Sequence, residues 1–328
     1  MASGDETAPR PFTICREDER VPASLRRAVV GIGNFDGVHR GHRVLVAAVR
    51  AAAAEAARPS AILTFEPHPR VYFARGGPMF RLTGEAAREV VFRRLGLDGV
   101  IVRRFDAVLA GTGARDFVMG LLRDDLGLSG VVVGHDFHFG RWREGTPAVL
   151  AALCAEAGLG CRIVEPVALE GEAEPVSSSA IRQALARGDV GRANALLGYR
   201  WFVLASVRHG DKRGRTLGYP TANLALDGCG LAHGIYAVRV RLTDGTLRDG
   251  VASYGRRPTF DDGAPLLEVN LFGFSGDLYG QEIGVELVGF IRGEERFPGA
   301  AELIARMDID AGEAKAQLAA DRTPSMLG

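Results

Sequence analysis

Short apolar runs alternate with amphipathic segments over roughly the first 188 residues. Five runs rich in β-branched residues are typical of buried strands, at residues 27–33, 60–67, 99–105, 130–136 and 161–167. Five stretches with helical spacing lie between or after them, at residues 39–57, 85–96, 114–127, 146–158 and 178–188. This alternation predicts βαβ units and a doubly wound, Rossmann-like parallel sheet. Ligands of such sheets bind at the carboxyl ends of the strands.

The pattern changes after about residue 200, where strand-like runs follow one another without intervening helices. These runs cover residues 201–208, 234–242, 246–253, 266–272 and 283–291. Asp244-Gly245 between two of them is a hairpin signal, and the series predicts a small antiparallel barrel. A helical pattern returns from Pro298 to about Ala320. We therefore predict a first domain over residues 1–187, a linker over 188–200 and a second domain over 201–328.

The composition excludes several classes of function. With 40 basic and 40 acidic residues among 328, the chain carries no net charge and presents no general surface for nucleic acid or membrane. Neither a signal peptide nor an apolar run of membrane-spanning length is apparent. The four cysteines form no CxxC pair, which argues against a disulfide framework or zinc site and favours the cytoplasm. A homo-oligomer is compatible with the sequence, which sets no oligomeric state.

The stretch GNFDGVHRGH, residues 33–42, joins the first strand to its helix. His39 and His42 are three residues apart, so both lie on one face of the first helical turn. Gly41 lets a ligand approach closely, and the free N–H groups of a helix start favour phosphate oxygens. A metal-binding pair or a surface coincidence is the alternative for two such histidines. The preceding strand and glycine turn favour phosphate.

A second candidate phosphate site is VSSSAIR, residues 176–182, which opens a helix near the end of the same predicted domain. Serine hydroxyls and helix-start N–H groups can bind phosphate, and Arg182 follows one turn later on the same side. The structural alternative is a serine N-cap with a solvated arginine.

The stretch GHDFHFG, residues 134–140, places aromatic side chains at a strand's carboxyl end, where a ligand cleft is expected. Phe137 and Phe139 could stack on a planar ring. Burial in the core explains them equally well.

The stretch HGDKRGRTLGYPTANL, residues 209–224, is suited to an anion although it is not a P-loop. Its glycines let backbone N–H groups face a phosphate, and Lys212, Arg213 and Arg215 supply charge. Thr221 and Asn223 point to one side of an extended segment and offer hard oxygen ligands for Mg²⁺ shared with a nucleotide. A mobile surface loop is the structural alternative. Glu268 lies in a strand-like run downstream, where it could also simply face solvent.

The first two motifs together resemble the nucleotidylyltransferase superfamily, which is marked by HxGH and a later SSTxIR. Residues 64–70 and 134–140 are similar to the adenylyltransferase module of the prokaryotic bifunctional riboflavin kinase/FAD synthetase family. The resemblance implies a nucleophile-free reaction, in which the phosphate of FMN attacks the α-phosphorus of ATP. It implies ATP contacts at Gly33, Asn34, Phe35, Asp36, Gly37, His39, Gly41, His42, Ser177, Ser178 and Arg182, with His39 and His42 catalytic. It also implies flavin or adenine contacts at Asp136, Phe137 and Phe139.

The run from Gly214 to Leu224 resembles the flavokinase signature GRxLGxPTANL. This resemblance implies that Glu268 is the general base for riboflavin's terminal hydroxyl. It implies kinase ATP contacts at Gly210, Lys212, Gly214, Arg215, Gly218, Pro220, Thr221 and Asn223, with Mg²⁺ at Thr221 and Asn223. Ser253 stands where this family commonly has Asn.

The resemblances imply a bifunctional enzyme with ATP, riboflavin and FMN as substrates and Mg²⁺ as cofactor. The implied fold is an adenylyltransferase domain followed by a flavokinase barrel with a C-terminal helix. Two alternatives are an FMN adenylyltransferase with a degenerate barrel and a non-catalytic flavin- or nucleotide-binding sensor. The presence of His39, His42, Arg182 and Glu268 together argues against the sensor.

Overall fold

The computed structural model describes residues 11–17, 19–74, 79–209, 219–256 and 265–328. Contacts divide the chain into two compact units. Unit 1 comprises Met1–Met79 and Glu89–Val176, and unit 2 comprises Phe80–Arg88 and Ser177–Gly328. The contacts thus place residues 80–88 with the C-terminal half of the chain. The boundaries at residues 187 and 200 were predicted from the sequence pattern and not from contacts.

Unit 1 is built on a six-stranded parallel sheet of order β1-β4-β3-β2-β5-β6. The strands are β1 (Thr13–Arg16), β2 (Val29–Ile32), β3 (Ser60–Glu66), β4 (Gly99–Arg104), β5 (Gly130–Gly134) and β6 (Gly160–Val164). The order reverses at β2, which lies between β3 and β5. This arrangement confirms the predicted doubly wound sheet, and such a reversal creates a crevice at the carboxyl ends of the strands.

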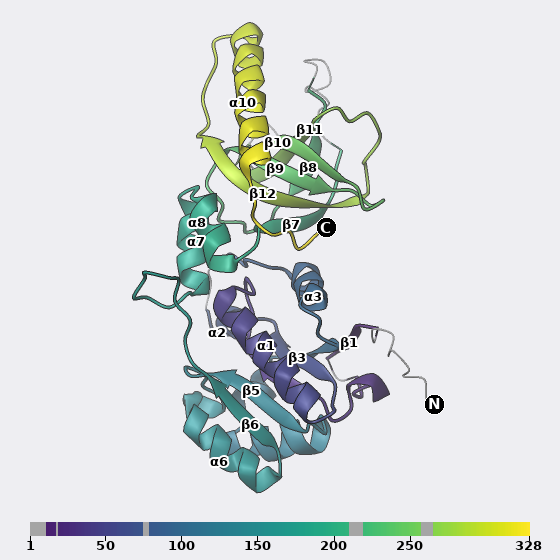
Figure 1. Cartoon of the computed structure of the whole chain (residues 1–328), viewed down its shortest axis with the longest axis vertical. Helices are drawn as coiled ribbons and strands as arrows, with labels where there is room; N and C mark the ends of the chain where they lie inside the picture. Colours follow the sequence, from purple (N-terminus) through teal and green to yellow (C-terminus); the bar gives the residue numbers. More distant parts are fainter. Residues whose placement is uncertain (1–10, 18, 75–78, 210–218, 257–264) are drawn as a thin grey trace, which may run out of the picture. The chain divides into compact units, whose positions relative to one another are not determined.

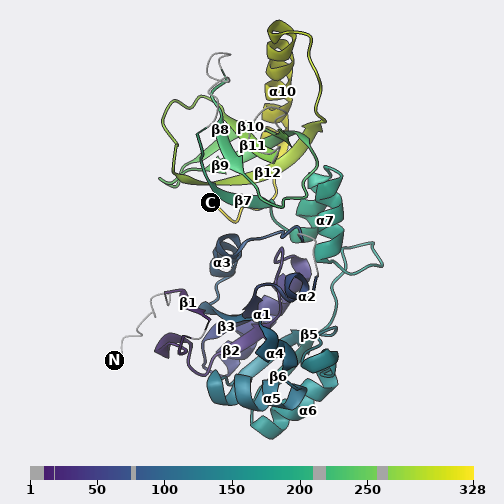
Figure 2. The same ribbon diagram turned by 180° about the vertical axis from the view of Figure 1, so that it is seen from behind.

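Helices cover both faces of this sheet (Figures 1 and 2). On one face, α1 packs Leu45 and Val49 so closely that a Cβ on Gly31 of β2 would lie 2.7 and 3.0 Å from them. On the other face, Phe117 and Leu150 join the core formed by alternate strand residues. The helical elements are α1 (Arg40–Glu55), α2 (Pro69–Phe73), α3 (Glu85–Arg94), α4 (Ala107–Gly111), α5 (Ala114–Asp116), the π-helix η2 (Phe117–Asp125) and α6 (Pro147–Ala157), with the short 3₁₀ turns η1 (Ala23–Leu25) and η3 (Arg141–Arg143).

Unit 2 contains a six-stranded antiparallel sheet of order β7-β12-β9-β10-β11-β8. Its strands are β7 (Phe202–Ser206), β8 (Ala222–Ala225), β9 (Gly234–Arg241), β10 (Leu247–Arg256), β11 (Pro265–Leu271) and β12 (Glu282–Arg292). A bridge between Arg208 and Asn223 links the chain after β7 to β8, so that the sheet nearly closes into the predicted barrel. The long helix α10 (Ala300–Ala320) packs Ala314 and Leu318 on Ala237 and Val251, on the outer face of the barrel (Figure 1).

Two helices, α7 (Ser178–Ala186) and α8 (Val190–Leu197), precede the barrel. Residues 188–200, predicted as a linker, therefore form mostly helix. The buried Asn194 of α8 donates from Nδ2 to the Leu287 carbonyl of β12 at 3.0 Å and accepts from the Trp201 amide at 2.8 Å. These bonds tie the segment to the barrel.

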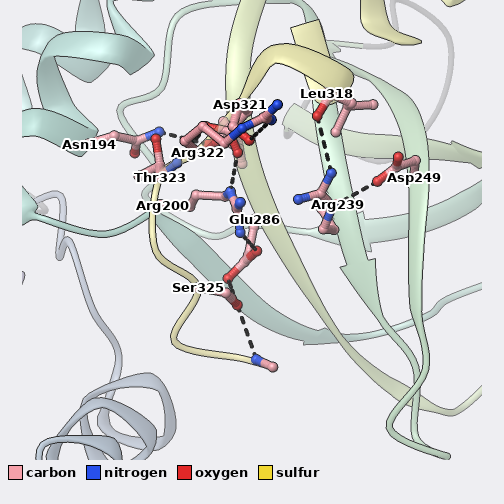
Figure 3. A network of polar contacts seen from close by, with 12 residues as sticks. Asn194, Arg200, Arg239, Asp249, Glu286, Leu318, Asp321, Arg322, Thr323 and Ser325 are labelled. Atoms are coloured by element: carbon pink, nitrogen blue, oxygen red, sulfur yellow. Dashed lines mark hydrogen bonds and ion pairs between the residues drawn. The ribbon is translucent and has the colours of Figure 1, made fainter.

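Buried ion pairs fasten the end of the chain to the barrel (Figure 3). Arg200 lies between Glu286 of β12, at 3.0 Å, and Asp321 at the end of α10, at 2.6 Å. Ser325 donates to Glu286 at 2.5 Å and accepts from the amides of Leu327 and Gly328. Within the described residues, no helix is both long and apolar enough to span a membrane.

Candidate functional site

The two histidines of the first motif lie at the start of α1, at the carboxyl end of β2. His39 is the N-cap of α1, and its Nδ1 accepts a hydrogen bond from the His42 amide at 3.4 Å. The two imidazole rings stack with their centroids 3.7 Å apart and their planes 19° from parallel. The structure thus brings the predicted pair together at the helix start, where free N–H groups and the helix dipole favour an anion.

The turn that presents these histidines has unusual backbone geometry. Phe35 and Val38 have φ of 49° and 36°, and Gly37 between them has φ of 87°. A positive φ is strained in a bulky or β-branched residue and persists only where the surroundings enforce it. Here the buried Phe35 ring packs against Phe92 and against the His42 ring, with centroids 5.5 and 5.0 Å away. The strained turn is therefore locked behind the imidazoles.

Burial controls the charge of both imidazoles. Desolvation lowers the pKa of His39 to about 4, although the carboxylates of Asp36 and Asp136 act in the opposite direction. The pKa of His42 is lowered well below its ordinary value, mainly by desolvation and to a smaller extent by repulsion from His39. His42 Nδ1 is buried and has no hydrogen-bond partner among the described residues. Both rings are therefore neutral near pH 7 in the free protein.

Other predicted residues of unit 1 lie around this pair. Asp36, almost fully buried, and Asp136, just after β5, act electrostatically on His39, which places both carboxyl groups near the helix start. A Cβ on Gly41 would lie 3.3 Å from the His39 ring and 4.0 Å from the Val176 carbonyl oxygen. Gly41 therefore leaves space that a side chain would fill, as a close-approaching ligand requires.

The aromatic residues after β5 pack on one another. The Phe137 and Phe139 rings stack with centroids 5.5 Å apart, and Phe139 is buried beside Phe117 in the core of unit 1. A Cβ on Gly145 would lie 2.5 Å from the Phe139 ring. Core packing thus accounts for Phe139, while Phe137 is only partly buried.

The second phosphate motif begins α7 in unit 2. Ser177 is the N-cap of α7, and its Oγ accepts from the Ala180 amide at 3.2 Å. The serine N-cap, which was the structural alternative for this motif, is therefore present. Arg182, however, is not simply solvated, because its Nε donates to the Phe80 carbonyl at 2.7 Å.

Residues 80–82 form an anchoring segment that the sequence did not reveal. The Trp201 indole donates to the Leu82 carbonyl at 2.7 Å, and the Phe80 ring packs edge-on against Trp201. Arg182 donates to the carbonyl two residues earlier. One short segment thus binds both the arginine of the second motif and Trp201, the residue just before β7.

The third motif brings two predicted kinase residues together. Asn223 of β8 and Glu268 of β11 are directly opposite each other in the antiparallel register. Their neighbours Leu224 and Leu267 are fully buried on the other face, so the two polar side chains share the outer face of the barrel. Ser253 of β10 pairs with Glu268 from the opposite side. Glu268 therefore lies between a buried amide and a small hydroxyl.

Several contacts fix the chain just before Asn223. Asn270 donates from Nδ2 to the Pro220 carbonyl at 2.9 Å, and the Arg208 amide donates to the Asn223 carbonyl at 2.8 Å. The Tyr219 hydroxyl donates to Asp308 of α10, and this hydrogen bond raises the pKa of Tyr219 to about 12. The predicted residues Gly210, Lys212, Gly214, Arg215 and Gly218 lie outside the described residues.

The donor atoms near Glu268 fit a magnesium ion shared with a nucleotide. Thr221 and Asn223 offer a hydroxyl and an amide oxygen, which are hard ligands of the kind Mg²⁺ accepts. Among the described residues, no group of three or more His, Cys, Asp and Glu is placed to hold a metal ion. Such an ion would therefore depend on nucleotide phosphates and water for most of its ligands.

Comparison with known proteins matches these two sites to two families. The family model for FAD synthetase matches residues 21–180, and the model for riboflavin kinase matches residues 197–318. The bifunctional riboflavin kinase/FMN adenylyltransferase of Haemophilus influenzae is 39% identical over 89% of this chain and 94% of that protein. The chain belongs to this bifunctional family. The first match contains the histidine pair and the second contains Asn223 and Glu268.

Further relatives agree. The bifunctional riboflavin kinase/FMN adenylyltransferase of Bacillus subtilis is 35% identical over 88% of this chain and 92% of that protein. A crystal structure described as a macrolide-efflux protein from Streptococcus pneumoniae is 30% identical, with a TM-score of 0.79 over 91% of this chain and 97% of that one. The family membership is the one predicted from the motifs, and neither the degenerate-barrel nor the sensor alternative is favoured.

Proposed function

We propose that this chain phosphorylates riboflavin to FMN and then adenylylates FMN to FAD. The observation that carries the proposal is that each unit holds its own constellation: stacked, neutral imidazoles at the start of α1, and the Asn223–Glu268 pair on the barrel. Both lie in segments matched by the corresponding family model.

In the kinase step, the terminal ribityl hydroxyl of riboflavin attacks the γ-phosphorus of ATP, and ADP leaves. Glu268 accepts the hydroxyl proton as general base. Thr221 and Asn223 would hold Mg²⁺, which when bound neutralises phosphate charge. Pro220, with its carbonyl fixed by Asn270, sets the direction of this segment. The glycine and basic residues from Gly210 to Gly218 complete the ATP contacts.

In the adenylyl step, a phosphate oxygen of FMN attacks the α-phosphorus of ATP, and pyrophosphate leaves. No covalent enzyme intermediate is needed, so catalysis consists of positioning and charge stabilisation. His39 and His42 donate hydrogen bonds to ATP as neutral imidazoles. They become protonated only when the negative charge of bound phosphate lies beside them. We propose Ser177, Ser178 and Arg182 as the further ATP contacts, and Asp136, Phe137 and Phe139 as contacts of the flavin or adenine ring. A cytoplasmic location belongs to the same proposal, since the four cysteines are free thiols.

The test is to incubate the chain with riboflavin, ATP and Mg²⁺ and to resolve the flavins by chromatography over time. FMN should appear first and FAD second. Omitting Mg²⁺ in the presence of a chelator should stop both steps. Formation of neither flavin would overturn the proposal, and FAD from supplied FMN without FMN from riboflavin would restrict it to the adenylyl step.

A further inference from the structure

Asn270 is a buried amide on the same strand and the same face as Glu268. It lies two residues after Glu268 in β11, and residues two apart in a strand project to one side. Its side chain belongs to a residue that is 9% exposed, and its Nδ2 donates to the Pro220 carbonyl at 2.9 Å. The bond spans 50 positions of sequence and reaches the residue that begins Pro-Thr-Ala-Asn.

This hydrogen bond joins the two halves of the kinase constellation. Glu268 is fixed by the β11 ladder, and Asn223 is fixed opposite it in β8. The chain between Pro220 and Ala222 precedes the ladder pairing, so Thr221 depends on the position of Pro220. Asn270 therefore sets the position of Thr221 relative to the strand that carries Glu268.

Burial distinguishes this anchor from the neighbouring one. The Tyr219–Asp308 contact lies at the exposed surface, where water competes for both groups. Pro220 itself is exposed, but the Asn270 amide is buried, so a turn that moved away from Asn270 would leave a buried donor unsatisfied. Such a loss costs more than the loss of an exposed hydrogen bond. The amide of Asn270 is therefore the stronger constraint on this turn.

We propose that Asn270 is a positioning residue of the riboflavin kinase reaction, which holds the Pro220 carbonyl and so aligns Thr221 with Asn223 and Glu268. This role rests on the proposed function. Asn270 acts through the turn and touches no reacting atom. Its loss should weaken the use of magnesium and ATP while leaving the adenylyl step intact.

Asn270→Ala tests this role, with Asn194→Ala as the matched control. Asn194 is also a buried amide of unit 2 that donates to a backbone carbonyl, but its acceptor is Leu287 of β12 and not Pro220. We expect Asn270→Ala to raise the Mg²⁺ concentration for half-maximal kinase activity, and the KM for MgATP, about tenfold. Asn270→Gln, which keeps the amide donor, should recover part of this loss.

Folding is checked on the same samples through FAD formation from supplied FMN and through emission of the buried Trp201. Asn194→Ala should lower the unfolding midpoint without changing the magnesium requirement. The role is overturned if Asn270→Ala leaves the magnesium requirement unchanged, if both alanine variants change it equally, or if Asn270→Gln loses as much as Asn270→Ala. A wild-type chain that makes no FMN from riboflavin would instead overturn the proposed function itself, and the positioning role with it.

Discussion

Asn223 and Glu268 face each other across strands β8 and β11, on the outer face of the barrel and one residue away from its apolar interior. The pairing places a neutral amide beside the proposed base. A second carboxylate at this position would repel Glu268, because like charges directly opposite in a sheet are unfavourable and share protons.

We therefore expect Asn223→Asp to lower kinase activity at pH 7 at least tenfold and to move the acidic limb of the kinase pH profile upward. The carboxylate pair would hold a proton to higher pH, which removes the base. The measurement is kcat/KM for riboflavin between pH 5 and 9, with FAD formation from FMN on the same sample as the control. A pH profile identical to that of the wild type would contradict the placement of Glu268 as base.

Gly41 is expected to be intolerant of a side chain. A Cβ would lie 3.3 Å from the His39 ring, closer than ordinary van der Waals contact, so Gly41→Ala must displace that imidazole. We expect FAD formation to fall about tenfold or more, since small displacements of catalytic groups are costly. Riboflavin phosphorylation should not change. Gly120→Ala is the control in the same unit, because a Cβ there meets no atom within 4 Å; an equal loss in both variants would refute the steric explanation.

The buried imidazole of His39 should make unit 1 sensitive to acid. Its pKa is about 4 when folded and near 6.5 when unfolded, so the unfolded chain binds more protons between these values. Stability is therefore lost as the pH falls from about 6.5 to 4, and His39 alone contributes about 2 kcal/mol of this loss between pH 7 and 5. Urea unfolding followed by circular dichroism at the two pH values tests this. His39→Gln should lose clearly less stability than the wild type over the same interval, and an equal loss would contradict the assignment.

The Arg200 network should matter for stability more than exposed ion pairs do. Glu286 is fully buried between Arg200 and Ser325 (Figure 3), so Glu286→Ala leaves a buried guanidinium with one partner fewer. We expect a loss of about 3–5 kcal/mol for this variant and a much smaller loss for the triple variant R200M/E286M/D321N, which removes all three charges of the network. Glu156→Ala, which breaks an exposed pair with Arg115, should have little effect.

Urea unfolding followed by tryptophan emission reports on this network, because Trp201 is buried in unit 2 whereas Trp142 is 91% exposed. A triple variant as unstable as Glu286→Ala would contradict the view that the imbalance of buried charge is the main cost.

The sequence predicted those helices and strands in which apolar residues recur at regular spacing. Strands β2 to β6 and the helices between them follow from apolar runs and helical spacing, and β9 to β12 follow from strand-like runs. Pattern did not predict β1, α2, α4 or the helical nature of residues 188–200. These are short, or they depend on distant partners: β1 is an edge strand that pairs with β4, and α8 is held by Leu287 and Trp201.

The site was predictable where adjacent residues carry the chemistry. His39 and His42 are three positions apart, and Thr221 and Asn223 are two apart. Asn270 shares the period of two with Glu268, which was a usable signal, but its acceptor at Pro220 could not be foreseen from either stretch. The anchoring of Arg182 by Phe80 joins residues 102 positions apart and left no trace in the local pattern.

The central claim is that two separate sites act in succession within one chain, and two variants measured in two assays test it most directly. Each variant is given riboflavin or FMN, with ATP and Mg²⁺, and the products are resolved. His42→Ala should form FMN from riboflavin at the wild-type rate and form no FAD from either flavin. Glu268→Ala should form no FMN from riboflavin and should convert supplied FMN to FAD at the wild-type rate. A folded variant of either kind that loses both steps would contradict the assignment of separate sites.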